Sequence, residues 1–224
     1  MKFHYTTLET CHAATGLVLI IDVLRAFSNA AFAFSRGVKE ILLVSTVEEA
    51  LALKEQIPNS KAMGEVNGIP PQGFDLGNSP TRILEENLEG MTIIQRTGAG
   101  TQGAVRSVKA DVMFATSFVV ADATMSTVLK LKPQEITFVI TGGEDNAEDL
   151  ACAKFLEKQF TGQAVEAHEY IQRVVTSKDA SYHLQGDPNF PKSDLEYCTH
   201  INAFDFAMPI TRENGQLIMR AVRK

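Results

Sequence analysis

Short apolar runs alternate with amphipathic stretches over the first 160 residues of the chain. Residues 17–21 are continuously apolar, which is typical of a strand covered on both faces of a sheet. In residues 27–34 apolar side chains recur at i, i+3, i+4 and i+7, which predicts one face of a helix, and Gly37 suits the C-terminal cap of that helix. A buried strand followed by an amphipathic helix is the repeating unit of layered α/β proteins.

Four more such units are expected downstream. Thr46-Val47-Glu48-Glu49 is a capping box that begins a helix, and Ser79-Pro80 has the residue preferences of another helix start. Strands are expected at 41–44, 91–95, 111–115 and 136–140, and helices from Thr46 to near Pro58, from Ser79, after the glycine-rich turn at 97–103, from about Ser117, and from about Asn146 to Phe160. This pattern predicts a layered α/β domain.

The C-terminal part of the chain has a different pattern. Apolar residues at helical spacing predict one more amphipathic helix within 167–175. Asn214-Gly215 lies between the apolar runs 204–210 and 216–220, and this dipeptide is typical of a two-residue β-hairpin turn because both residues tolerate positive φ. Pro209 lacks an N–H, so we expect it to keep the first hairpin strand at a sheet edge or in a bulge.

Length and charge restrict the classes of protein that fit. The chain has 224 residues, with 21 Lys and Arg against 27 Asp and Glu, a formal net charge of −6. We therefore expect no nucleic-acid partner, because a nonspecific nucleic-acid binder needs a basic surface. The longest apolar run, 17–21, is far shorter than the ~20 residues that cross a bilayer, and the N-terminus lacks the pattern of a signal peptide, so we expect no membrane partner.

This length fits one domain over residues 1–224, with a strand–helix core at 1–160 and a C-terminal helix and hairpin at 161–224. An unpaired hairpin and 13 Phe residues leave room for a homodimer interface.

The three cysteines are odd in number and far apart, so we expect no disulfide scaffold and a cytoplasmic location. The pairs Cys11-His12 and Cys198-Thr199-His200 lack the ligand spacing of a tetrahedral zinc site, so we expect buried structural thiols instead.

Ligands of open α/β sheets bind beyond the carboxyl ends of the strands, so polar residues at those junctions are candidates for chemistry. Asp22 ends the first strand directly after five apolar residues, and a buried acid there needs a cation, a metal or several hydrogen-bond donors. It could cap the next helix, or it could act as a metal ligand or nucleophile with Arg25 facing an anion. These roles are compatible.

A long glycine-containing segment between residues 58 and 79 carries two further acids, Glu65 and Asp75. Loops of this length are usually functional or disordered, and the apolar residues of this one argue against disorder. Each acid, taken alone, is as well explained by a solvated loop carboxylate as by a ligand.

The turn Thr97-Gly98-Ala99-Gly100-Thr101-Gln102-Gly103 follows a strand and precedes a helix, where glycines allow a ligand to approach the backbone. Arg96 adds a permanent positive charge suited to oxyanions. The turn contains a formal Gly-x-Gly-x-x-Gly, but the next strand ends without the acid that would hold a ribose, so the dinucleotide motif is a weak match. A plain tight turn explains the segment equally well.

Glu144, Asp145, Glu148 and Asp149 form an acidic run at the last strand–helix junction of the core. Acids in a first helical turn favour the helix dipole, but four exceed what capping requires, and hard oxygen ligands gathered near Asp22 are what Mg²⁺ prefers. The five histidines lie outside these junctions, so a histidine phosphoenzyme is not expected.

These motifs together resemble the 2-phosphosulfolactate phosphatase family, the magnesium-dependent phosphatases of coenzyme M biosynthesis. The resemblance covers most of the chain and is carried by four ordered blocks: Ile21-Asp22-Val23-Leu24-Arg25-Ala26; Gly64-Glu65 with Gly73-Phe74-Asp75-Leu76-Gly77-Asn78-Ser79-Pro80; the turn 97–101; and Glu148-Asp149 after Gly142-Gly143. The third block departs from the family pattern, because Ala99 stands where an Asn is expected before Gly-Thr.

The resemblance implies an α/β fold with three layers, α/β/α, around a largely parallel sheet. It also implies a phosphoric monoester hydrolase that uses Mg²⁺ to convert (2R)-phospho-3-sulfolactate, or a similar small phosphorylated acid, to 3-sulfolactate and phosphate. It implies Asp22 and Arg25 as catalytic residues. The metal ligands would come from the acids Asp22, Glu65, Asp75, Glu148 and Asp149. The residues expected to bind the anionic substrate are Asn78, Ser79, Arg96, Thr97, Gly98, Gly100 and Thr101.

Two alternatives belong to other functional classes. The hypothesis of an NAD-dependent oxidoreductase rests on the turn at Gly98–Gly103 alone. A non-catalytic anion-binding protein would keep the fold without releasing phosphate from any phosphoester, although unused buried carboxylates would destabilise such a protein.

Overall fold

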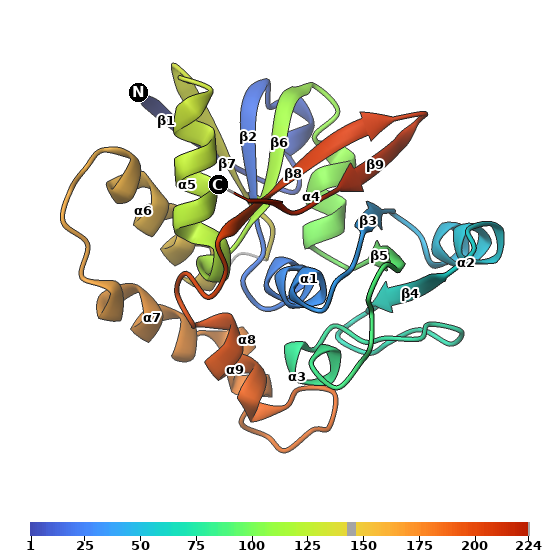
Figure 1. Ribbon diagram of the computed structural model, residues 1–224. Coiled ribbons are helices and arrows are strands. Elements are labelled where there is room, and N and C mark those ends of the chain that lie inside the picture. Colours follow the sequence, from blue (N-terminus) through green and yellow to red (C-terminus); the bar gives the residue numbers. More distant parts are fainter. Residues whose placement is uncertain (143–146, 224) are drawn as a thin grey trace.

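The computed structural model describes residues 1–142 and 147–223 (Figure 1). Within these residues ten strands form one sheet, in the order β1-β7-β2-β6-β8-β9-β3-β5-β4, with β10 beside β8. The strands are β1 (Lys2–Thr7), β2 (Gly16–Ile21), β3 (Glu40–Leu43), β4 (Ser60–Gly64), β5 (Thr92–Arg96), β6 (Ala110–Thr116), β7 (Glu135–Ile140), β8 (Phe206–Glu213), β9 (Gln216–Met219) and β10 (Val222–Arg223). Strands β1, β7, β2 and β6 are mutually parallel, as are β3, β5 and β4.

Helices lie on both sides of the sheet. They are α1 (Ala26–Ser35), α2 (Val47–Gln56), α3 (Pro80–Ile83), α4 (Gly100–Arg106), α5 (Ala121–Lys130), α6 (Ala147–Phe160), α7 (Ala167–Val175), α8 (Lys178–Tyr182) and α9 (Lys192–Cys198), with the short 3₁₀ helices η1 (Cys11–Ala13) and η2 (Phe118–Val120). The five predicted strand–helix units are β2–α1, β3–α2, β5–α4, β6–α5 and β7–α6, so the predicted α/β fold with its largely parallel sheet is confirmed.

Strand β2 shows why the chain forms three layers. Val18 and Ile20 pack in one hydrophobic cluster with residues of α1 and α4, while Leu19 and Ile21 pack in a second cluster with residues of α5 and α6. Successive strand side chains point to opposite faces, so a continuously apolar strand requires cover on both sides.

Helix α1 is more deeply buried than its pattern predicts. The sequence indicates one apolar face, but Ser28 and Asn29 on the other side are also fully buried. Helix α1 contacts α3, α9 and η2 as well as strand β6 of the sheet, so it has no solvent-facing side over most of its length. The predicted cap is present, with Gly37 at a φ of 85°.

The C-terminal hairpin lies inside the sheet. Strands β8 and β9 join through Asn214 and Gly215, both at positive φ (51° and 82°), as predicted for this dipeptide. Strand β8 pairs antiparallel with β6, and β9 pairs antiparallel with β3, so the hairpin links the two parallel sets of strands. Because both hairpin strands are paired on their outer sides, the unpaired hairpin that was expected to leave room for a homodimer does not exist.

The expected edge position of Pro209 is wrong, because β8 is central. Pro209 faces Phe114 of β6 on one side. On its other side the partner strand changes, since β9 pairs only as far as Ile210 and β10 begins opposite Ala207. The missing N–H of the proline therefore falls in the gap between two partner strands.

Several elements were not predicted from the sequence. Strands β1 and β4 form the two edges of the sheet, and β4 lies in the segment that was interpreted as a long loop. Helices α8 and α9 follow α7; α8 packs against α7, and α9 lies beside α3 (Figure 1). The helix predicted after Ser79 is the single turn α3, and Ser79 stands at its N-cap position without a capping hydrogen bond from its side chain.

Within the described ranges, none of the helices has the length and apolar character needed to cross a membrane. Cys11, Cys152 and Cys198 are free, buried thiols.

Candidate active site

The carboxyl ends of β2, β4 and β5 meet at one cleft. Asp22 follows β2, Glu65 follows β4, and Gly98 lies in the turn after β5. The Gly98 N–H donates to Glu65 Oε1 over 2.5 Å, and a Cβ placed on Gly100 would lie 2.7 Å from Asp22 Oδ2. The strand ends therefore approach one another, although the hairpin separates β2 from β4 and β5 in the sheet order.

This cleft has a volume of about 570 Å³. The residues that line it come from the segments after β2, β4 and β5, from α8 and from the segment between α8 and α9. They are Asp22, Leu24, Arg25, Glu65, Asn67, Gly68, Ile69, Asn78, Gly98, Ala99, Asp179, Tyr182, His183, Asp187 and Phe190. A larger groove of about 960 Å³ lies near the amino ends of β2 and β7, and the predicted site residues do not line it.

Asp22 combines the two roles that its position suggests. Its Oδ1 accepts a hydrogen bond from the Ala26 N–H at the start of α1 over 2.8 Å, so the carboxylate supports the helix start. The side chain is 5% exposed and lines the cleft. Burial raises the pKa of Asp22 to about 6, and repulsion from Glu65 and Asp179 adds to that rise, while the N–H groups of Ala26 and Gly100 oppose it.

Asp149, on the first turn of α6, holds the ends of two strands together. Its Oδ1 accepts from the Val23 N–H over 2.8 Å, and its Oδ2 accepts from the Gly142 N–H over 3.1 Å and from the Thr141 hydroxyl over 3.3 Å. Burial raises the pKa of Asp149 well above its usual range, with Asp22 as the largest source of repulsion.

Glu148 and Asp179 complete a group of four acids that also contains Asp22 and Asp149; we refer to these four residues as the acidic cluster. Burial raises the pKa of Glu148 to about 7, and both Asp179 and Asp22 add repulsion. Burial also raises the pKa of Asp179. Glu144 and Asp145, the other acids predicted at this junction, lie outside the described residues, as does Gly143.

Glu65 joins two loops of the cleft. Its Oε1 accepts from Gly98 and its Oε2 accepts from the Gly68 N–H over 2.7 Å. The carboxylate thus fixes the turn after β5 against the loop after β4. Asn78 lines the same cleft, and its Oδ1 is buried without a hydrogen-bond partner among the described residues.

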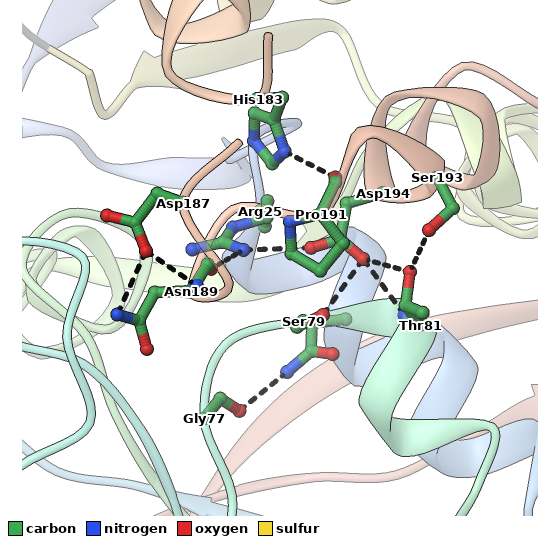
Figure 2. A network of polar contacts seen from close by, with 11 residues as sticks. Arg25, Gly77, Ser79, Thr81, His183, Asp187, Asn189, Pro191, Ser193 and Asp194 are labelled. Atoms are coloured by element: carbon green, nitrogen blue, oxygen red, sulfur yellow. Dashed lines mark hydrogen bonds and ion pairs between the residues drawn. The ribbon is translucent and has the colours of Figure 1, made fainter. Parts of the chain in front are cut away.

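Arg25 is a buried cation that lines the cleft. Figure 2 shows the contacts of its guanidinium. Its Nη1 donates to Asp194 Oδ2 over 2.8 Å and to the Asn189 carbonyl over 2.7 Å. The guanidinium carbon lies 4.6 Å from the centre of the Phe190 ring, a cation–π contact. Among the described residues that line the cleft, Arg25 is the one permanent positive charge.

One wall of the cleft is formed by residues 179–194, and no motif in the sequence indicated it. His183 lies in this wall, although the histidines were placed outside the site: its Nδ1 donates to the Pro191 carbonyl over 2.9 Å, and burial lowers its pKa. Asp194 was also missed. The Pro188-Asn189-Phe190-Pro191 stretch could have indicated an ordered loop, but nothing local connects that loop with Arg25.

Four residues expected to bind substrate instead build the frame of the site. The Ser79 hydroxyl donates to Asp194 Oδ1 over 2.9 Å. The Thr97 N–H donates to the Thr101 hydroxyl over 2.8 Å, and that hydroxyl donates to the Thr97 carbonyl over 2.9 Å. The Arg96 guanidinium donates to the Glu65 carbonyl over 2.7 Å. These four side chains do not line the cleft, and the hydrogen bonds described here support the backbone around it.

Asp75 is not brought to the cleft. Its Oδ1 pairs with Lys54 Nζ over 2.8 Å, and its Oδ2 accepts from the Ala62 N–H over 2.8 Å. Both oxygens fix the loop beside β4, so the structure does not bring Asp75 together with the acids of the cleft.

The chemistry of the remaining acids suits a hard cation. Carboxylate oxygens are the ligands that Mg²⁺ prefers, and a cation would relieve the repulsion that helps to raise the pKa values of Asp22 and Glu148. In the part of the chain that the structure describes, no three acid, His or Cys side chains form a ready-made metal cage. Mg²⁺ does not need one, because it usually binds one or two carboxylates and completes its shell with water and phosphate oxygens.

A largely parallel sheet with a polar cleft at its strand carboxyl ends defines the chain as an α/β protein with a ligand site at that edge. Comparison with known proteins makes the assignment specific. A family model described as 2-phosphosulpholactate phosphatase matches residues 4–213.

A protein of Bacillus subtilis (strain 168) named probable 2-phosphosulfolactate phosphatase is 35% identical over 208 residues, which cover 92% of this chain and 91% of that protein. Proteins of the same name from Carboxydothermus hydrogenoformans and Thermotoga maritima are each 31% identical, over 95% and 90% of this chain and 93% and 91% of their own lengths. The chain belongs to the 2-phosphosulfolactate phosphatase family.

The alternatives find no support. The oxidoreductase hypothesis needs free backbone N–H groups in the glycine-rich turn to bind a dinucleotide. The Gly98 N–H of that turn instead donates to the Glu65 carboxylate. A Cβ placed on Gly103 would lie 2.8 Å from both Ile20 and Thr141, so this glycine serves helix packing. The family assignment likewise gives no ground for a non-catalytic anion-binding protein.

Proposed function

We propose that this protein is a Mg²⁺-dependent phosphoric monoester hydrolase that converts (2R)-phospho-3-sulfolactate, or a similar small phosphorylated acid, to 3-sulfolactate and phosphate. Membership of the phosphatase family supports the reaction class. The observation that carries the proposal in the structure is the position of Asp22, a buried carboxylate with a raised pKa that faces the same cleft as the Arg25 guanidinium.

Charge balance supports a metal ion. The described lining contains the carboxylates of Asp22, Glu65, Asp179 and Asp187 against the single guanidinium of Arg25. A substrate that carries phosphate, carboxylate and sulfonate would be repelled by this lining unless a cation were bound. Mg²⁺, held by Asp22 and Glu148, would supply that charge and neutralise the phosphate oxygens during bond cleavage.

The protein's own residues have distinct tasks in this proposal. Arg25 binds an anionic group of the substrate through the side of its guanidinium that faces the cleft, and the Asn78 amide offers a neutral hydrogen-bonding group. Asp149 and Glu65 hold the backbone around Asp22 through their bonds to strand-end N–H groups.

Two routes for the chemical step fit the position of Asp22. In the first, a water molecule attacks phosphorus, the P–O bond to the substrate's alcohol oxygen breaks, and the alcohol product leaves. In the second, Asp22 attacks phosphorus and the same P–O bond breaks, and a water molecule then hydrolyses the aspartyl phosphate to release phosphate and restore Asp22. The stereochemistry at an isotopically chiral phosphate distinguishes them: inversion indicates one displacement by water, and retention indicates two displacements through Asp22.

Phosphate release from a panel of small phosphorylated acids tests the function. We expect turnover of (2R)-phospho-3-sulfolactate, or of a related phosphorylated acid, with Mg²⁺, and its loss with EDTA. Turnover that survives chelation would remove the metal from the proposal, and failure to release phosphate from every member of the panel would remove the activity.

We also propose that the enzyme acts in the cytoplasm, which the three free buried thiols support. The homodimer stays a prediction, and light scattering of the purified protein tests it.

A further inference from the structure

Arg25 forms an ion pair that is almost completely buried. The Arg25 and Asp194 side chains are 4% and 0% exposed. The two oxygens of Asp194 divide their partners: Oδ2 accepts from Arg25, whereas Oδ1 accepts from the Ser79 hydroxyl over 2.9 Å and from the N–H and hydroxyl of Thr81 over 2.9 and 2.6 Å (Figure 2). Asp194 thus joins the start of α3, the start of α9 and the cleft.

Arg25 pairs with Asp194 although other carboxylates lie closer to it in the sequence or line the same cleft. Asp22 is only three residues from Arg25, and three further carboxylates line the cleft. Arg25 nevertheless pairs with an acid 169 positions away in the sequence. A guanidinium in a weakly hydrated site is strongly attracted to any nearby carboxylate, so without Asp194 the acids of the cleft would compete for it.

The other contacts of Arg25 leave part of its guanidinium free. Nη1 is shared by Asp194 and the Asn189 carbonyl, and Phe190 covers one face. The remaining guanidinium nitrogens have no hydrogen bond to the described residues, while Arg25 lines the cleft. A planar guanidinium with a free edge is suited to a carboxylate, sulfonate or phosphate.

We propose that Asp194 is a positioning residue for this enzyme. It holds Arg25 away from the carboxylates of the cleft, so that those acids stay available for a cation and the free edge of Arg25 stays available for an anionic group of the substrate. This inference rests on the proposed function, but it concerns binding and is tested without turnover.

The test uses Asp194→Asn in the full-length protein. The Asn oxygen can still accept from Ser79 and Thr81, whereas its NH₂ group cannot accept from Arg25 Nη1. Calorimetric titration with 3-sulfolactate and with inorganic phosphate, each with Mg²⁺, measures the affinity. We expect at least one of the two affinities to fall by about tenfold or more, because a hydrogen bond between charged groups is lost.

Thr81→Val is the matched control, because it removes a hydrogen bond to Oδ1 and leaves the Arg25 contact in place. It should lower the melting temperature and leave both affinities unchanged. If both variants lose affinity equally, or if Asp194→Asn loses none, the inference is overturned. Should Asp194→Asn not fold, Asp194→Glu, which keeps the charge but displaces the carboxylate, is judged by the same affinities.

A double-mutant cycle with Arg25→Lys shows whether Asp194 acts through Arg25. We expect the double variant to bind no more weakly than Arg25→Lys alone, whereas additive losses would contradict the inference. If the wild-type protein binds these anions but does not hydrolyse the substrate, the proposed function is contradicted and the positioning role of Asp194 is not. A wild-type protein that binds neither anion would overturn the positioning role itself.

Discussion

Asp22 shows how one side chain can serve the fold and the chemistry together. One of its oxygens accepts the first N–H of α1, as a capping residue would, while the carboxylate lines an acid-rich cleft. An Asn at this position could still accept that hydrogen bond, but it could not supply negative charge to a metal or attack phosphorus. The two roles can therefore be separated by an isosteric substitution.

We predict that Asp22→Asn lowers kcat by at least about a thousandfold, the scale seen when a principal catalytic group is removed. The metal-free variant should melt at a temperature no lower than the wild type, because the buried charge is removed and the cap is retained. Asp75→Asn is the control, since Asp75 pairs with Lys54 away from the cleft and should leave kcat near normal. Near-normal turnover of Asp22→Asn would leave this residue with the capping role alone.

Gly100 is the residue at which the backbone must approach Asp22 closely. A Cβ at this position would lie 2.7 Å from Asp22 Oδ2 and 2.9 Å from the Ala26 Cβ. We predict that Gly100→Ala displaces the carboxylate and lowers kcat/KM by about tenfold or more, because small misplacements of catalytic groups are costly. Steady-state kinetics would measure the change.

Gly77→Ala is the matched control for Gly100→Ala. A Cβ on Gly77 would meet only Pro70, at 3.8 Å, and the residue does not need positive φ. Its kinetic parameters should stay close to those of the wild type, and equal losses in the two variants would show that the effect of Gly100→Ala is not specific to Asp22.

At the scale of elements, the sequence predicted best those features that depend on neighbouring residues. The apolar run of β2, the capping contact between Thr46 and the Glu49 N–H, and the Asn214-Gly215 turn are all local. The same local signals failed where tertiary contacts decide: Pro209 lies in a central strand because two partner strands meet opposite it. Similarly, β4 has a weak apolar pattern and becomes a strand through pairing with β5.

In the candidate site, too, the sequence predicted what depends on neighbouring residues and missed what depends on tertiary contacts. The sequence could predict the candidate site residues that stand at or near strand ends or in the blocks that resemble the phosphatase family: Asp22, Arg25, Glu65 and Asn78. The role of Asp194 could not, because it depends on a contact across 169 positions. Asp75 had an equally suggestive sequence context, but pairing with Lys54 satisfies it elsewhere.

The hairpin turn between β8 and β9 requires positive φ at both of its central residues. Gly215 has a φ of 82°, and a Cβ there would meet no atom within 4 Å, so the cost of a side chain is conformational. We predict that Gly215→Ala lowers the free energy of unfolding by about 1 kcal/mol and leaves kcat unchanged. Urea denaturation measures the loss. Asn214→Gly, which also permits positive φ, should change stability much less, and a larger loss there would contradict the turn assignment.

At the scale of the whole molecule, the acidic cluster makes the folded state sensitive to pH. A carboxyl whose pKa is higher in the folded chain than in the unfolded chain keeps its proton over a wider pH range when folded. The folded state then binds more protons than the unfolded state, so the free energy of unfolding falls as the pH rises through that interval. For Asp22 the pKa rises from 3.8 to about 6, and for Glu148 from 4.5 to about 7.

We therefore predict that the metal-free protein becomes more stable as the pH is lowered from 7.5 to 5.5, with a gain in melting temperature on the order of 5 °C. Calorimetry in EDTA measures this trend, and Asp22→Asn should reduce it because one of the titrating carboxyls is absent. Mg²⁺ should weaken or reverse the trend, since a metal binds the deprotonated carboxylates and so stabilises the fold more at higher pH. A melting temperature that stays constant or falls as the metal-free protein is acidified over this range would show that the four acids are not held together as the structure places them.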